Sequence, residues 1–206
     1  MARAQGRSIL LTTHFSGADE ARSTSELRSL SPVLGKRGGT MVSAKVRCIG
    51  CGGLVPQMDW PTHRYMESSP GCWYVYGEVL SREYSDLAFG ALHRLTVDSY
   101  AVQHPGRPSP QSIQSVCVHL ISLCLAVERG VELAYATRVM GAAVRTKERF
   151  VWLTPPRSVG EITVGDVAAV STAAAHVQIV RAWAESAWSA WGDHHQMVRS
   201  WLPERG

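Results

Sequence analysis

The sequence predicts an all-α protein, a helical bundle with a small loop-rich lobe at its N-terminal end. Serine and proline stand in succession at the starts of two periodic segments, a pairing typical of helix N-termini. An apolar stripe of helical period runs through the C-terminal part of the chain. The spacing Cys48-Ile-Gly-Cys51-Gly-Gly, followed by a proline-rich segment, sets the lobe apart from the bundle.

Composition and charge divide the chain into two parts. Residues 1–40 are rich in Ser, Thr, Arg and Gly without periodicity, which predicts a disordered tail or an upstream extension before Met41. We expect residues 41–206 to form a single metal-binding helical domain, with the lobe over 45–72 and the bundle over 73–202. Residues 48–206 carry 13 Lys or Arg against 14 Asp or Glu, so nucleic acid is not an expected partner.

Helix start and stop signals define the first part of the bundle. The expected helices cover residues 70–84, 86–104, 110–128 and 132–145. Ser69, Ser85 and Ser109 are suited to cap the first three, because a serine hydroxyl accepts from a free backbone N–H group at a helix start. Gly130 lies where the third helix would stop, since glycine adopts the left-handed conformation common after a helix.

The C-terminal part contains one short apolar segment and one long amphipathic run. Residues 150–153 are expected to form a lone strand or a packed loop. Thr163 and Asp166 resemble a capping box that opens the run, and Gly192-Asp193 could divide it. One helix face would carry His176, Val180, Trp183, Ala187, Trp191, His194, Val198 and Trp201. We interpret its tryptophans as core residues.

Four residues near the N-terminal end predict a zinc-knuckle lobe. Cys48 and Cys51 are spaced as half of a metal knuckle, and His63 and Cys72 could complete a tetrahedral Cys3His set, which is typical of structural zinc. With the cytosol as the expected compartment, the five cysteines are more readily ligands or thiols than disulfides. A thioredoxin-like redox pair is disfavoured by the glycines after Cys51, and ordinary thiols remain an alternative.

A second set of polar residues lies on the predicted bundle helices. His93, Tyr100 and His104 share one helix face, and His119 lies on the following helix. The two histidines of that face are about 16 Å apart along a helix, so they cannot bind one ion together. These side chains and Asp98 are candidate acid/base groups, with Asp98 also suited to pair with Arg94. The alternative is hydrogen-bonded interior histidines, with His104 at a helix C-terminus.

Several motifs resemble a family of unknown function. Residues 61–66 read PTHRYM, 68–73 SSPGCW, 77–80 GEVL, 82–85 REYS and 93–106 HRLTVDSYAVQHPG, and Gln-Ser-Val follows at 114–116. From about Cys48 to Trp201 the chain resembles the bacterial domain-of-unknown-function family numbered 5946. The resemblance implies a bacterial source and makes the segment before Met41 a departure from the usual start. It implies no fold, reaction or substrate.

Three classes of function remain. The first is a binding or regulatory module with structural zinc and a small-molecule or protein partner. The second is a metal-dependent or acid/base enzyme with its site between the helices that bear His93, Tyr100, His104 and His119. The third is a thiol-based sensor that releases its metal on oxidation. No apolar run of about 18 residues is evident, so a membrane span is not expected.

Overall fold

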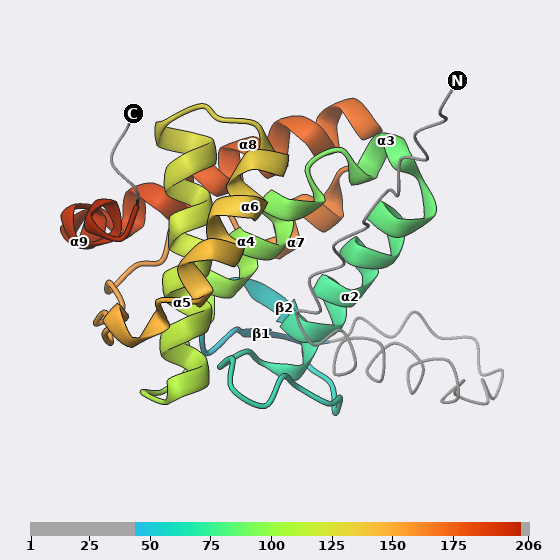
Figure 1. Ribbon diagram of the computed structural model, residues 1–206. Coiled ribbons are helices and arrows are strands. Elements are labelled where there is room, and N and C mark those ends of the chain that lie inside the picture. The colour runs from blue at the N-terminus through green and yellow to red at the C-terminus, as the bar shows by residue number, and fades with distance from the viewer. Residues whose placement is uncertain (1–43, 203–206) are drawn as a thin grey trace, which may run out of the picture. The chain divides into compact units, whose positions relative to one another are not determined.

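The computed structural model describes residues 44–202 and is mainly helical (Figure 1). One two-stranded hairpin precedes the helices in this part of the chain, which confirms the predicted fold class. The tail expected over residues 1–40 lies outside the described residues.

The hairpin frames the Cys48–Cys51 motif. Strands β1 (Lys45–Arg47) and β2 (Leu54–Pro56) pair antiparallel, and the cysteine motif forms the turn between them. The turn closes because the Cys48 N–H group donates to the Gly53 carbonyl at 2.8 Å. Gly52 has φ +72°, a conformation that favours glycine. Strands of three residues carry too little alternation to be predicted from sequence.

The first predicted helix is present, but the residues near its ends play different roles. Helix α2 (Pro70–Ser85) has Ser69 at its N-cap position, yet the Ser69 hydroxyl accepts from the Ile49 N–H group at 3.0 Å instead of capping. Ser85 is the last residue of α2, and its hydroxyl donates to the Ser81 carbonyl. The cap of the next helix is Asp86, which accepts from the Ala88 N–H group.

The segment expected as one helix over 86–104 is two helices, α3 (Leu87–Gly90) and α4 (His93–Gln103). A Cβ atom at Gly90 would meet the Glu83 carbonyl, so the chain bends where it passes close to α2.

Ser109 caps α5 (Pro110–Leu123) as predicted, and the helix continues as a π-helical turn, Cys124–Glu128. Helix α6 (Leu133–Val144) follows, then a short 3-10 turn, Lys147–Arg149. Residues 150–153 form a packed loop, the second of the two predicted alternatives, with Phe150 and Leu153 buried.

The long amphipathic run is divided twice. It consists of α7 (Val164–Ala169), α8 (Ala173–Ala190), a 3-10 turn (Gly192–His194) and α9 (His195–Ser200). The predicted capping box is present at the start of α7. The unpredicted first break follows α7.

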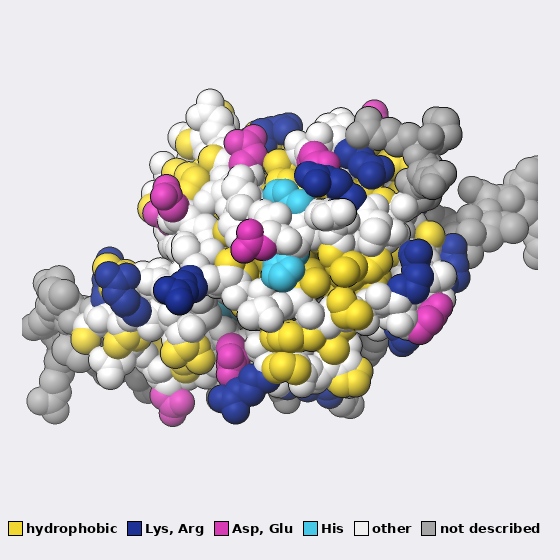
Figure 2. All heavy atoms as spheres, turned by 90° about the vertical axis from the view of Figure 1, so that its left-hand side faces the viewer, with side chains coloured by type: hydrophobic (Ala, Val, Ile, Leu, Met, Phe, Trp, Pro, Cys, Tyr) yellow, Lys and Arg dark blue, Asp and Glu magenta, His cyan; other side chains and the backbone are white. Residues whose placement is uncertain are grey.

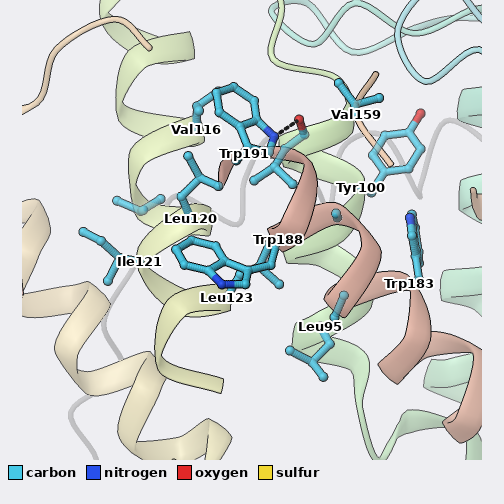
Figure 3. Close-up of a cluster of buried hydrophobic side chains, with 14 of the residues drawn as sticks. Leu95, Tyr100, Val116, Leu120, Ile121, Leu123, Val159, Trp183, Trp188 and Trp191 are labelled. Atoms are coloured by element: carbon cyan, nitrogen blue, oxygen red, sulfur yellow. Dashed lines mark hydrogen bonds between the residues drawn. The ribbon is translucent and has the colours of Figure 1, made fainter. Parts of the chain in front are cut away.

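Helix α4 lies at the centre, between α5 and α8, while α2 packs against α7 and α6 against α5 (Figure 1). The core between α4, α5 and α8 is filled by aromatic and aliphatic side chains, including Trp183 and Trp191, both fully buried (Figure 3). The Trp191 indole donates to the Val102 carbonyl at 3.2 Å. The tryptophans of the amphipathic stripe are therefore core residues.

One helical stretch of the described chain, Pro110–Glu128, is long and apolar enough to cross a membrane by length and composition. This corrects the expectation that no such stretch exists. In its most apolar window 67% is buried within the protein. A core helix of a soluble protein passes the same test, so the stretch is weak evidence for a span.

Candidate metal centre

Four buried side chains from three parts of the chain converge beneath the hairpin. Cys48 and Cys51 come from the turn between the strands, Cys72 from the first turn of α2, and His104 from the C-terminal end of α4. Their ligand atoms all lie within 4.8 Å of one another. Four donors of this kind are close enough to bind one metal ion.

The distances within the group fit a tetrahedral ion. Sγ of Cys51 and Sγ of Cys72 are 3.8 Å apart, and Nε2 of His104 lies 3.5 Å from Sγ of Cys48 and 3.4 Å from Sγ of Cys72. Bond lengths typical of zinc place neighbouring sulfurs about 3.8 Å apart and a sulfur and a nitrogen about 3.6 Å apart. These three distances match those expected between the ligands of one tetrahedral zinc ion.

His104 is held with the correct nitrogen toward the sulfurs. Its Nδ1 lies 2.7 Å from the Tyr100 carbonyl oxygen, which can only accept, so Nδ1 carries the proton and Nε2 faces the cysteines. Burial alone would lower the pKa of His104, but hydrogen bonds and charge from Cys48 and Cys51 raise it to about 9. The sulfurs around this imidazole therefore favour a positive charge, which a bound metal ion would supply in place of a proton on Nε2.

The thiols of Cys48 and Cys72 differ in their readiness to ionise. Hydrogen bonds from Cys51 and Cys72 lower the pKa of Cys48, whereas hydrogen bonds with Cys48 and Cys51 raise the pKa of Cys72. Three facing sulfurs cannot all be thiolates in a buried site without a cation between them. A divalent ion would supply that charge, so the donor set fits a thiophilic metal.

Close backbone packing supports the centre. The Ser69 N–H group points at Sγ of Cys48 at 3.4 Å, the type of second contact that orients a metal-bound thiolate. A Cβ atom at Gly50 would collide with the His104 ring and the Glu67 carbonyl, and one at Gly71 with the Pro56 carbonyl. Only glycine allows these segments to meet.

His63, the histidine expected in the metal set, does not belong to the group. Its ring meets Tyr65 edge-on at 4.2 Å between centroids and lies 5.3 Å from Trp73. The structure thus brings together Cys48, Cys51 and Cys72 of the predicted ligands, with His104 as the fourth.

The candidate acid/base residues fall into three separate groups. Tyr100 and His104 belong to the metal centre, where the Tyr100 hydroxyl lies 3.8 Å from Sγ of Cys72. Asp98 pairs with His119 at 2.7 Å and with Arg94 at 2.8 Å, the latter as the sequence predicted. His93 belongs to a third group.

The third group was not expected from sequence and centres on Glu83, whose side chain is fully buried. Its carboxylate accepts from His93 at 2.7 Å, from Thr96 and from His176 at 2.8 Å. Arg82 donates to the other ring nitrogen of His176 and to the carbonyls of Val167 and Val170. A buried glutamate and histidine on separate helices leave no local sequence signal.

The fold and the site therefore define a class of protein, a helical protein with a Cys3His centre. A profile of the family of unknown function DUF5946 matches residues 46–192, and the chain belongs to this family. The match runs from the second residue of the hairpin through α8 and includes all four residues of the centre. No curated protein and no solved structure matches the chain.

Proposed function

We propose that this protein binds one zinc ion, that the ion is structural, and that the protein acts as a binding or regulatory module. The observation that carries the proposal is the set of four buried protein donors, Cys48, Cys51, Cys72 and His104. Sulfur and imidazole donors favour zinc over magnesium or calcium. Four protein ligands close a tetrahedral site, whereas a catalytic zinc keeps a position open for water or substrate.

The charge distribution supports a small-molecule or protein partner. Basic and acidic side chains are interspersed with apolar ones on the face shown in Figure 2, so neither sign dominates there. A nucleic-acid interface would carry a basic patch or stripe.

The enzyme alternative requires one site shared by His93, Tyr100, His104 and His119. These side chains lie in three polar groups with different buried partners, so they support no joint acid/base site. The Asp98–His119 pair could orient an imidazole as a base, but Arg94 and Ser122 also bind this aspartate, which equally serves to join α4 to α5.

Elemental analysis of the purified full chain tests the proposal. We expect about one zinc per chain, retained after gel filtration. Cys51→Ser and His104→Ala should both lower this ratio, and His63→Ala, the matched control, should leave it unchanged. A native chain without zinc, or a His63→Ala chain that loses it while His104→Ala retains it, would refute the proposed centre.

A further inference from the structure

A cleft lies directly beside the metal centre. It has a volume of about 320 Å³, within the range of roughly 300–1,000 Å³ that small-molecule sites occupy. The cleft is lined by residues of the hairpin turn, of the loop before α2, and of the segment that leads into α5. Among them are Ile49, Arg64, Met66, Ser68, Arg107 and Ser109. The cleft therefore offers both polar and apolar contacts.

The charges that line the cleft leave one positive charge uncompensated. Nε of Arg107 lies 2.8 Å from a carboxylate oxygen of Glu67, so these two side chains neutralise each other. Arg64 forms no ion pair with any residue in 44–202. A guanidinium group binds a carboxylate through two parallel hydrogen bonds. A single free charge matches a monoanion better than a phosphate dianion.

The hairpin turn supplies an apolar side chain to the cleft. Ile49 is 73% exposed, and it lines the cleft together with Met66. The Ser68 hydroxyl is buried nearby and lacks a hydrogen bond of good geometry, although it lies within reach of the Tyr100 hydroxyl. Through Ser68 the cleft thus adjoins Tyr100, which belongs to the metal centre.

We infer that this cleft binds a small monocarboxylate with an apolar body, and that the metal centre holds one of its walls in place. This inference rests on the proposed function. The Ile49 N–H group donates to the Ser69 hydroxyl at 3.0 Å, and the Ser69 N–H group in turn points at Sγ of Cys48 at 3.4 Å. An ion that fixes Cys48 therefore also fixes the side of the cleft on which Ile49 stands.

Backbone NMR titration of the zinc-loaded full chain with hexanoate tests the inference, with 1-hexanol and inorganic phosphate as comparators. We expect saturable shifts at residues that line the cleft, and weaker binding of both comparators. Arg64→Gln should weaken hexanoate binding about tenfold, because a charge-assisted hydrogen-bonded pair is lost. The exposed Arg181→Gln on α8 is the matched control and should bind normally. Absent shifts, shifts confined elsewhere, or tighter phosphate binding would overturn the inference.

Two further experiments separate the contribution of the apolar wall to hexanoate binding from that of the metal ion. Ile49→Ser should weaken hexanoate binding, and Leu87→Ser, which removes an even more exposed aliphatic side chain from α3, should not. Zinc is measured on the same samples. Zinc at one per chain without hexanoate binding overturns the cleft alone, whereas a chain without zinc overturns the proposed function. Unchanged hexanoate binding after zinc removal would refute the link between the two.

Discussion

Removing the Glu83 carboxylate should destabilise the fold more than any exposed substitution on the same helix. Glu83 joins α2 to α4 through His93 and Thr96 and to α8 through His176, with its side chain fully buried. Arg82 can only donate to Nδ1 of His176, so Nε2 of this ring must carry a proton and needs an acceptor. Glu83 supplies that acceptor.

The expected size follows from the groups left behind. Glu83→Ala leaves the Thr96 hydroxyl and the His176 N–H group buried without their acceptor, at about 1–3 kcal/mol each, and leaves a cavity. Together these costs amount to a loss of roughly 3–5 kcal/mol. Glu83→Gln keeps one oxygen facing Thr96 and His176, and His93 can change tautomer to accept from the amide. We therefore expect Glu83→Gln to lose about half as much unfolding free energy as Glu83→Ala.

Urea unfolding at pH 7, followed by circular dichroism on zinc-loaded protein, measures these differences. Glu78→Ala is the matched control, because this glutamate is exposed on α2 and should change the unfolding free energy by less than about 0.5 kcal/mol. If Glu83→Ala loses less than about 1 kcal/mol, the network does not hold the helices together and the reasoning is wrong.

Three other predictions concern pH, packing and thiol reactivity. Burial would raise the pKa of Glu83, but hydrogen bonds from surrounding groups lower it below 4.5. The contribution of Glu83 to stability is therefore complete above pH 4.5 and is lost as the pH falls through its folded-state pKa. The difference in unfolding free energy between wild type and Glu83→Gln should shrink on acidification. Gly50→Ala should reduce zinc content because its Cβ atom would collide with the His104 ring, whereas Gly77→Ala, with no atom in its way, should stabilise α2 by up to about 1 kcal/mol. Burial raises the pKa of Cys117 to about 12, so a thiol reagent at pH 8 should modify this cysteine only after unfolding; fast labelling of the native protein at Cys117, mapped by mass spectrometry, would contradict its placement.

The parts of the fold that depend on neighbouring residues were predictable. Ser109 caps α5 and Gly130 follows its end with φ +63°, because both act within a few residues of their own position. The bend at Gly90 was not predictable, since its cause is a close approach to the Glu83 carbonyl of another helix. Ser85 and Ser69 show the limit of cap signals, because a serine hydroxyl can bond elsewhere.

The candidate site shows the same division. The spacing of Cys48 and Cys51 is a local property of the hairpin turn. The fourth donor is brought in by the packing of α4 beneath the hairpin, so nothing in the spacing of the cysteines distinguishes His104 from the nearer His63. Its position directly after α4, two residues before Gly106, was visible in the sequence but indicated only a helix terminus.

X-ray absorption at the zinc edge of the native protein tests the central claim most directly. A closed centre formed by Cys48, Cys51, Cys72 and His104 predicts three sulfur ligands at about 2.3 Å and one imidazole nitrogen at about 2.0–2.1 Å. His104→Ala should remove the imidazole signal and His63→Ala should preserve it. A native spectrum with a water oxygen in the coordination sphere, or with two sulfurs, would contradict a closed structural site.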